Sequence, residues 1–189
     1  GIFGVRVRDV TREQRAVGKT VNFATIYGQG AFGLSRQLGI SAGEASSYIE
    51  NYFKKYPAVA KYRESVLYEA KNRGYVETLF GRRRPVEDLS SQNRMAAQIA
   101  ERAAFNTVFQ GTAADIIKIA MIDIHIGIGK ISKEARMIVQ VHDELLFEVP
   151  DGDCEVLKSF VISKMEGAAQ LKVPLVVDVG IADNWADAH

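Results

Sequence analysis

Four side chains stand four residues apart near the start of the chain, and their types suit one kind of ligand. They are Arg15, Lys19, Phe23 and Tyr27, and Gly28 follows at once. At 3.6 residues per turn this spacing places all four on one slowly drifting stripe of a helix. Such a stripe is often only a solvated basic face that runs into two core aromatics. It also suits a nucleotide, with phosphates at the cationic end and a sugar and base at the aromatic end.

A second candidate site lies between two apolar runs within residues 137–149, where His142, Asp143 and Glu144 occupy a tight turn. The alternation of apolar and polar residues predicts a β-hairpin around that turn. We expect the flanking strands to be largely buried, and adjacent carboxylates fixed there would repel each other unless a cation lay between them. Polar residues are ordinary at a turn, so the turn is either structural or a cation site.

Arg102, Asn106 and Gln110 repeat the four-residue spacing later in the chain. On a helix they share one face, where they are either merely exposed or able to donate hydrogen bonds to the minor-groove acceptors that every base pair presents. A protein that holds duplex DNA of any sequence would use such donors. The arginine run over 82–84 also has two interpretations, a solvated loop or a contact with a nucleic-acid backbone.

The elements that position these residues are helical in the first part of the chain. Thr11 with Gln14 forms a capping-box start and Gly28 a natural stop, which predicts the helix that carries the first stripe. Ser41 with Glu44 is a second capping box. The expected helices in this part cover residues 11–27, 31–38, 41–56 and 57–73.

Three glycines after the first helix, Gly28, Gly30 and Gly33, match the dinucleotide-binding fingerprint letter for letter. That fingerprint requires a strand before it and a helix after it, and here a helix precedes it. We therefore reject a dinucleotide site and expect a helix–turn–helix joint.

The second part of the chain mixes helices and strands, so the expected fold class is α+β with an antiparallel sheet. The expected elements are, in chain order, a strand or extended arm over 75–80, a long helix over 91–127, the hairpin over 137–149, a helix over 153–169 and a strand over 174–181. We expect the long helix to be interrupted near Gln110 and Gly111. Its strongly apolar segment, 112–126, is expected to be a buried core helix.

Length and composition limit the number of domains, the possible disulfides and the kinds of ligand. A chain of 189 residues with 47% hydrophobic residues suffices for one domain or two small ones, and the single Cys154 excludes an internal disulfide. Residues 1–110 carry 17 Lys and Arg against 10 Asp and Glu, whereas residues 111–189 carry 7 against 13. A basic part beside an acidic part is what a polyanion-binding surface next to a cation site needs.

The chain has neither a long uncharged apolar run nor the charged-then-apolar order of a secretory signal. We therefore expect a soluble, cytosolic protein with no membrane partner. The first eight residues carry no start signal of their own and are typical of the tail of an upstream structure. We expect the chain to be a fragment.

Several of these segments together resemble one protein family. The pattern RxxxKxxxFxxxYG over 15–28 resembles the motif B helix of family A DNA polymerases, and VHDE over 141–144 resembles their motif C. The stretches GYVETLFGRRR, QGTAADIIK and VPLVVDVG are similar to the same proteins, above all to bacterial members. The ordered motifs cover almost the whole chain, which makes the combined resemblance specific.

The resemblance implies a role for each residue of the first stripe. Arg15 and Lys19 would hold the triphosphate of an incoming deoxynucleotide, and Lys19 would neutralise charge that develops during phosphoryl transfer. Phe23 would pack on the sugar, and in this family phenylalanine rather than tyrosine there goes with discrimination against dideoxynucleotides. Tyr27 would stack near the templating base, with Gly28 letting the helix swing closed.

The other candidate residues would bind DNA and metal. The later helix face would grip the minor groove of the primer–template DNA through Arg102, Asn106 and Gln110. His142 would lie near the primer end. Asp143 would be a ligand of a catalytic Mg²⁺ pair, with Glu144 beside it as a second metal-binding and catalytic carboxylate. We expect Lys19 and Asp143 to face one another across a single cleft.

The same resemblance implies a fingers subdomain over 1–98 and the later part of a palm over 99–189. The family's motif A, an upstream strand with the other essential metal-binding Asp, is absent, as is the thumb. We therefore expect this fragment alone to be inactive, with the missing upstream segment as its partner in the bacterial cytosol or nucleoid. A catalytically silent nucleic-acid-binding module and an unrelated α+β protein with a structural turn are the alternative interpretations.

Overall fold

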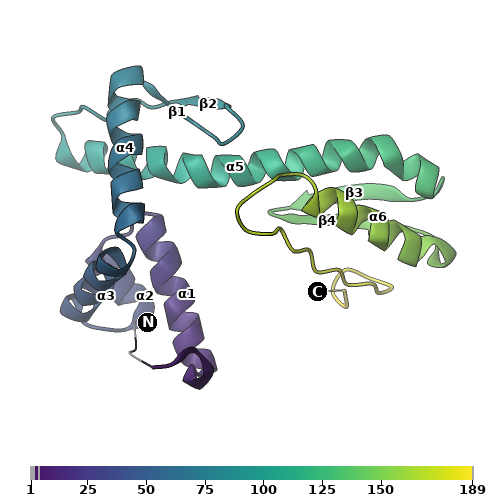
Figure 1. Ribbon diagram of the computed structural model, residues 1–189, viewed down its shortest axis with the longest axis horizontal. Helices are drawn as coiled ribbons and strands as arrows, with labels where there is room; N and C mark the ends of the chain where they lie inside the picture. The colour runs from purple at the N-terminus through teal and green to yellow at the C-terminus, as the bar shows by residue number, and fades with distance from the viewer. Residues whose placement is uncertain (1–2, 4, 189) are drawn as a thin grey trace. The chain divides into compact units, whose positions relative to one another are not determined.

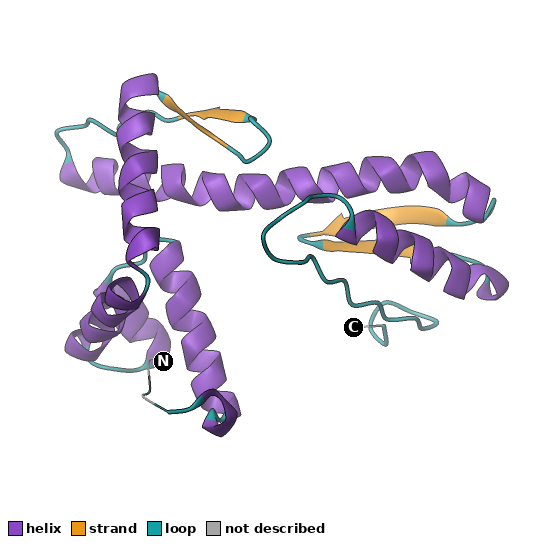
Figure 2. Ribbon diagram, in the orientation of Figure 1, coloured by secondary structure: helices purple, strands orange, loops and turns teal. Residues whose placement is uncertain are grey.

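The computed structural model describes residues 3 and 5–188 (Figure 1). The chain forms two compact units, Gly1–Phe109 and Gln110–His189, and each is described by itself. Helices dominate, and Figure 2 shows the strands as two small antiparallel pairs. This content confirms the expected α+β class. The expected boundary between fingers and palm, after residue 98, is a statement about function and stays a prediction.

The first unit begins with η1 (Val7–Asp9), a short 3₁₀ helix that was not predicted from the sequence. The helices that follow match the prediction to within about one residue at each end, and they are α1 (Arg12–Ile26), α2 (Ala31–Leu38), α3 (Ala42–Lys55) and α4 (Pro57–Arg73). Both predicted capping boxes are formed. Thr11 Oγ1 accepts a hydrogen bond from the Gln14 backbone N–H at 3.2 Å, and Ser41 Oγ accepts one from Glu44 at 3.2 Å. These caps satisfy backbone groups that a helix end leaves unpaired, so the local sequence determines where each helix begins.

The joint between α1 and α2 is a tight turn, as predicted. Gly28 has a φ of 69°, a left-handed conformation that glycine adopts without steric cost. The Gly28 N–H donates to the Thr25 carbonyl oxygen at 3.1 Å, and α2 begins at Ala31. The glycine pattern is therefore part of a helix–turn–helix joint and not a dinucleotide-binding loop.

Two apolar clusters hold the first unit together. The cluster between α1, α2 and α3 comprises Val21, Ala24, Leu34 and Ala45. The cluster between α4, the first hairpin and the start of α5 comprises Ala70, Val76, Leu89, Ala100 and Ala104. The first cluster fixes the face of α1 that lies opposite its stripe of cations and aromatics, and the second anchors the beginning of α5.

The short hairpin of β1 (Tyr75–Glu77) and β2 (Arg83–Pro85) contains part of the arginine run. Arg83 and Arg84 lie in a strand and are exposed, so the expected loop is wrong for these two residues whereas their expected exposure is confirmed. The strand forms because Arg83 contacts residues across the hairpin, and no local sequence pattern identifies those partners. Arg83 Nε donates to Glu77 Oε1 at 2.8 Å, and the Arg83 guanidinium lies 4.7 Å from the centre of the Tyr75 ring.

The long helix α5 (Arg94–Ile131) runs without the interruption expected near Gln110 and Gly111. A glycine in a helix interior costs only about 1 kcal/mol relative to alanine, which the alanine- and isoleucine-rich flanks outweigh. Although α5 is long, no helix among the described residues combines the length and the apolar character needed to cross a membrane.

The later part of α5 is buried on one face only. Ile117 and Ile124 are buried, whereas Ile122 and Ile126 are 58% and 68% exposed. The expectation of a buried core helix over 112–126 is therefore wrong for half of its surface. The described elements of this unit pack on only one side of α5, so the residues on its other side are exposed.

The second unit contains the predicted hairpin and the predicted amphipathic helix. Its elements after α5 are β3 (Arg136–Val141), β4 (Glu144–Glu148), η2 (Asp151–Asp153) and α6 (Cys154–Glu166). They surround a small apolar cluster of Ile124, Ala135, Leu157 and Val161. The expectation that both hairpin strands are largely buried is wrong, because Ile138 and Val139 are exposed and a two-stranded ribbon packs on one face only.

Residues 174–181 do not form the predicted strand. The segment forms no regular secondary structure, and Val176 within it and Val173 just before it are exposed. The Val177 N–H donates to Glu166 Oε1 at 3.1 Å instead of to a neighbouring strand. A strand requires the backbone of a partner, and among the described residues the two sheets contain only β1 with β2 and β3 with β4.

Candidate active site

The cation–aromatic stripe of α1, defined as Arg15, Lys19, Phe23 and Tyr27, is formed as predicted. The first three side chains are exposed along one side of the helix, and Tyr27 is half-buried at its C-terminal end. Lys19 Nζ lies 6.0 Å from the centre of the Phe23 ring. The Phe23 and Tyr27 rings are stacked, with centroids 6.0 Å apart and planes inclined by 14°. The stripe therefore presents positive charge that passes directly into aromatic faces.

The opposite side of α1 holds this stripe in position. Val21 and Ala24 are buried against α2 and α3, and the buried Thr25 hydroxyl donates to the Val21 carbonyl oxygen at 2.7 Å. A helix with one face in an apolar core cannot rotate about its own axis without exposing that face. The side chains of the stripe are consequently held on the outer face by the packing of the opposite side of α1.

The C-terminal end of α1 contacts α5 at two of the predicted DNA-binding residues. Asn106 Nδ2 donates to the Tyr27 carbonyl oxygen at 3.5 Å, a long hydrogen bond. A Cβ atom at position 28 would lie 3.0 Å from Arg102 Cγ, so the turn also approaches the stem of that side chain closely. Position 28 therefore requires glycine twice, for its positive φ and for this approach. The structure brings the aromatic end of α1 together with the outer face of α5.

That face of α5 carries the predicted donors. Arg102 and Gln110 are exposed and Asn106 is half-buried, and the unbroken helix keeps the three on one side. The Asn106 Oδ1 atom is buried and has no hydrogen-bond partner among the described residues. A buried polar atom without a partner carries a cost in free energy, which lowers the stability gained from the contact of this amide with α1.

A second link to α5 was not foreseen from the sequence. Arg84 Nη1 donates to Thr107 Oγ1 at 2.7 Å, and the Thr107 hydroxyl in turn donates to the Ala103 carbonyl oxygen at 2.6 Å. Thr107 is buried and directly follows Asn106. Arg84 thus ties the first hairpin to α5. No sequence signal distinguishes this threonine from others in helix interiors, and a contact of the arginine run with nucleic acid stays a prediction.

The acidic turn of the second hairpin, defined as His142, Asp143 and Glu144, is exposed throughout. Val141 pairs with Glu144, and His142 adopts a left-handed φ of 54°, which is uncommon for a residue other than glycine. Gln140 Nε2 donates to the His142 carbonyl oxygen at 2.9 Å and so helps to hold the turn. The role of Gln140 was not foreseen, because a glutamine in a hairpin strand gives no signal of such a contact.

The acidic turn offers two neighbouring carboxylates as oxygen ligands. Magnesium ions in proteins are commonly held by one or two carboxylates together with waters and substrate phosphates, so Asp143 and Glu144 fit such an ion. Among the described residues, no three His, Cys, Asp or Glu side chains gather into a fuller metal site. A metal ion at this turn would therefore need further ligands from a substrate or from another protein segment.

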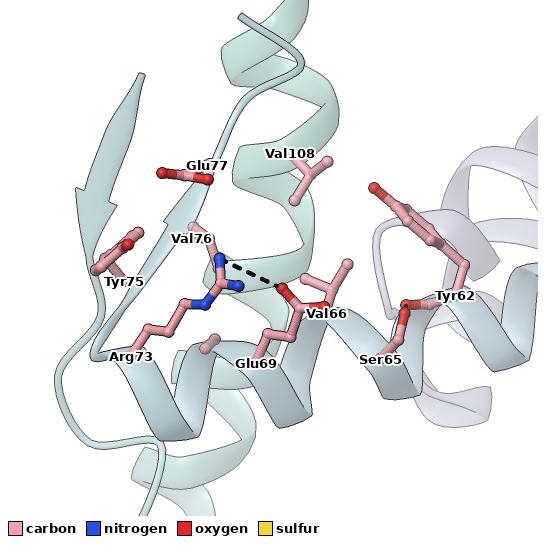
Figure 3. A pocket seen from close by; sticks show the side chains of 10 residues that line it. Tyr62, Ser65, Val66, Glu69, Arg73, Tyr75, Val76, Glu77 and Val108 are labelled. Atoms are coloured by element: carbon pink, nitrogen blue, oxygen red, sulfur yellow. Dashed lines mark hydrogen bonds and ion pairs between the residues drawn. The ribbon is translucent and has the colours of Figure 1, made fainter. Parts of the chain in front are cut away.

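The stripe and the acidic turn belong to different units, α1 to Gly1–Phe109 and the turn to Gln110–His189. Their expected position on two sides of one cleft stays a prediction. A separate pocket of about 150 Å³ lies in the first unit between α4, β1 and Val108 of α5 (Figure 3). Glu69 and Arg73 form an ion pair at its wall at 3.6 Å, and no predicted site residue lines it.

Comparison with known proteins gives consistent matches over nearly the whole chain. DNA polymerase I of Pseudomonas aeruginosa is 45% identical over 188 residues, which cover 100% of this chain and 21% of that protein. The thermostable DNA polymerase I of Thermus filiformis is 46% identical over 187 residues, covering 99% of this chain and 22% of that protein. The chain thus spans about a fifth of the length of the curated relatives it matches.

A solved structure and a family model agree with these relatives. The structure is described as the POL domain of Pol1 from M. smegmatis in complex with DNA primer–template and dNTP. It superimposes with a TM-score of 0.93 at 42% identity, covering 99% of this chain and 33% of that one. The model of DNA polymerase family A matches residues 1–187. The expected resemblance is confirmed, and the chain belongs to DNA polymerase family A.

Proposed function

We propose that this chain supplies the nucleotide-binding helix and one side of the metal site of a template-directed DNA polymerase, which adds deoxynucleotides to a primer 3′-OH. The observation that carries the proposal is the cation–aromatic stripe of α1, whose aromatic end is docked on the donor-bearing face of α5. The relative with a bound primer–template and dNTP supports the same classes of ligand for this chain.

The two ends of the stripe bind chemically different parts of a nucleoside triphosphate. Arg15 and Lys19 bind the triphosphate, since both are exposed cations on the outer face of α1. Phe23 packs on the sugar and Tyr27 stacks near the templating base. In the reaction the primer 3′-oxygen bonds to the α-phosphorus while the bond to pyrophosphate breaks. Lys19 stabilises the charge that develops on the leaving group and is placed to give it a proton.

The face of α5 holds the primer–template duplex. Arg102, Asn106 and Gln110 donate to acceptors that all base pairs share in the minor groove, so the grip does not depend on sequence. His142 lies near the primer end. Asp143 and Glu144 would hold Mg²⁺, and the ion would supply positive charge next to the reacting phosphate.

The site of this chain is incomplete without further carboxylates. Within the described residues, Asp143 and Glu144 are not joined by a third metal-binding side chain. We infer that the chain acts as part of a longer polymerase, which supplies a second acidic strand, because the chain spans about a fifth of its relatives' length. Since those relatives are bacterial proteins, we place its action in the bacterial cytoplasm. The isolated 189 residues should bind DNA weakly and extend no primer. Extension that depends on Mg²⁺ by this fragment alone would contradict that inference.

Substitution of Lys19 tests the proposed function in the longer protein that contains this chain. Lys19→Ala removes a cation that acts on the leaving group, so we expect nucleotide addition in single-turnover assays to slow by about 10²–10³-fold. Binding of the primer–template, measured by fluorescence anisotropy without nucleotide, should change by less than about threefold.

Lys55→Ala is the matched control. Lys55 Nζ lies 5.8 Å from the centre of the Tyr56 ring, so it repeats the cation–aromatic geometry of Lys19 and Phe23 outside the stripe. This variant should keep both nucleotide addition and DNA binding. Equal losses of addition and of DNA binding in Lys19→Ala, or equal effects of the two substitutions, would refute the role of the stripe.

A further inference from the structure

Asn106, one of the proposed minor-groove donors, lies between two buried neighbours on α5. At 100° per residue, the side chains of Phe105 and Thr107 point about 100° to either side of it. These two residues are 1% and 6% exposed, whereas Asn106 is half-buried at the contact with α1. Both neighbours must stay covered, so the direction in which Asn106 points about the helix axis depends on what covers each of them.

The groups that cover the two neighbours differ in kind. On one side the Phe105 ring lies against the rings of Tyr62 and Phe109, with centroids 6.2 and 5.1 Å away. On the other side Arg84 Nη1, from the first hairpin, donates to Thr107 Oγ1 at 2.7 Å. Rings hold a helix through the shape of a broad contact, whereas a hydrogen bond holds one atom in one direction. Arg84 therefore supplies a directional support for this turn of α5.

The hydroxyl of Thr107 connects this support to the backbone that carries the donors. It donates to the Ala103 carbonyl oxygen at 2.6 Å, and a hydroxyl has only one proton, so its oxygen accepts the N–H of Arg84. A charged donor polarises the hydroxyl and strengthens its own donation. Bonds from threonine to the carbonyl four residues earlier commonly bend a helix. The pair therefore acts on the turn from Ala103 to Thr107, which includes Asn106 and directly follows Arg102.

We propose that Arg84 is a positioning residue, which acts through Thr107 to aim Asn106 and Arg102 at the minor groove. This inference rests on the proposed grip of the α5 face on DNA and adds a residue of the first hairpin to it. In this role Arg84 acts on the protein and not on the nucleic acid. A contact of Arg84 with the DNA backbone, considered above for the arginine run, predicts a different result in the experiment that follows.

Removal of single minor-groove acceptors gives a direct test in the longer protein. A primer–template would carry 3-deazaadenine in place of adenine at one of the base pairs nearest the primer end, which replaces the N3 acceptor by C–H. Affinity would be measured by fluorescence anisotropy without nucleotide or Mg²⁺. The deaza ratio, defined as the dissociation constant of the deaza DNA divided by that of ordinary DNA, reports an aimed donor. It should be about fivefold for the unmodified protein at a contacted base pair, since one hydrogen bond is lost.

Two substitutions remove the proposed support from its two ends. Arg84→Leu removes the donor, and Thr107→Val removes the acceptor while keeping a branched side chain and changing no charge. In each variant the deaza ratio should fall below about twofold, because the donors of α5 are no longer aimed. Arg84→Lys keeps a charged donor, which a single hydrogen bond requires, and should keep a ratio of at least about threefold.

Arg83→Leu is the matched control. Arg83 precedes Arg84 in β2, is exposed, and donates to Glu77 Oε1 at 2.8 Å within the hairpin. This variant removes the same charge from the same strand and should keep the fivefold deaza ratio. Because the ratio compares two DNAs on one protein, a general loss of stability or of attraction to phosphates cancels from it.

The other outcomes overturn the inference. A fivefold deaza ratio in either Arg84→Leu or Thr107→Val would show that the donors are aimed without this pair. If Arg84→Leu also bound ordinary DNA more weakly, that result would assign Arg84 to the phosphate backbone. A lost ratio in Arg83→Leu would assign the effect to the hairpin as a whole, and a lost ratio in Arg84→Lys would show that a charged donor is not what acts.

The same assay separates this inference from the proposed function. A deaza ratio near one at every base pair in the unmodified protein would refute the grip of the α5 face, and the role of Arg84 with it. A fivefold ratio that survives in the Arg84 and Thr107 variants would refute the role of Arg84 alone. Because the assay contains no nucleotide and no turnover, a failed Lys19 experiment beside the expected ratios would locate the error in the proposed reaction.

Discussion

The α1 stripe and the acidic turn serve the same proposed reaction but are built in different ways. α1 closes its own backbone hydrogen bonds, begins at a capping box and buries one face in a local core. The acidic turn sits at the end of a two-stranded ribbon that is exposed on one side and held by a side-chain contact from Gln140. The comparison shows that the start of α1 and the shape of the turn are both encoded locally, whereas a metal ion at the turn would need ligands from segments distant in sequence, since the described residues gather no third His, Cys, Asp or Glu there.

The largest expected effect is on the acidic turn. Asp143→Asn in the longer protein keeps the shape of the side chain and removes the charge of the proposed metal ligand, so we expect nucleotide addition to fall by more than about 100-fold. Asp151→Asn, at another exposed carboxylate of the second unit, is the control and should leave the rate unchanged. Rates from rapid-quench assays at several Mg²⁺ concentrations would check this. If Asp143→Asn kept the full rate of nucleotide addition, the acidic turn would not serve the same reaction as the α1 stripe.

The end of α1 should show the next largest effect, measured as stability. Gly28→Ala forces an alanine into a positive φ and toward Arg102, and we expect it to lower the free energy of unfolding of this chain by about 2 kcal/mol. Gly74→Ala is a matched control, because Gly74 has a φ of 77° with no atom within 4 Å of an added Cβ. Urea titrations should give a smaller loss for Gly74→Ala. Equal losses of unfolding free energy in the two variants would show that the close approach of position 28 to Arg102 does not affect stability.

Substitution of Phe23 tests which part of the nucleotide this residue of the stripe contacts. Phe23 is 44% exposed, and Phe23→Tyr adds a hydroxyl at the rim of a ring that we place against the sugar. One added hydrogen bond is worth about 1 kcal/mol, so use of chain-terminating nucleotides relative to ordinary ones should rise by at least about fivefold. Competition between the two nucleotides in primer extension measures the ratio. An unchanged ratio would remove the sugar contact from Phe23.

The smallest effect tests the claim that the helices are locally determined. Hydrogen bonds from the Ser41 hydroxyl and backbone N–H to the Glu44 carboxylate lower the pKa of Glu44 below its ordinary value of 4.5. A lowered pKa in the folded state stabilises the fold above that ordinary value, and the contribution is lost as the pH falls through the folded pKa. Stability should therefore decline slightly below pH 4.5, and less so in Glu44→Gln, which keeps the capping geometry without titrating.

That distinction between local and distant contacts explains which features were predictable. The start of α1 at Thr11, the start of α3 at Ser41 and the stop of α4 at Gly74 are encoded within a few residues, and all three are confirmed. The predictions that were wrong concern which other segments pack on or pair with a given segment. The hairpin strands are less buried than expected, residues 174–181 pair with no strand among the described residues, and Ile122 lies on a face of α5 that the described part of its unit leaves exposed.

The same limit applies to the candidate site. The spacing of Arg15, Lys19 and Phe23 was enough to place them on one outward face, since a helix converts spacing into position. The contacts of Asn106 with the Tyr27 carbonyl and of Arg84 with Thr107 join segments far apart in sequence, and no local pattern marks them. The catalytic and ligand-binding roles of the predicted residues stay predictions that the experiments above address.

The hydrogen bond between Asn106 and Tyr27 has an evolutionary consequence, because it reaches a carbonyl of the main chain and not the phenol ring. Any amino acid at position 27 would present the same oxygen, whereas only a side chain with a suitably placed donor can replace Asn106. Directed evolution can therefore exchange the aromatic at 27, which we propose lies near the templating base, and keep the joint intact. Diversity recovered from such a library should be broad at 27 and narrow at 106.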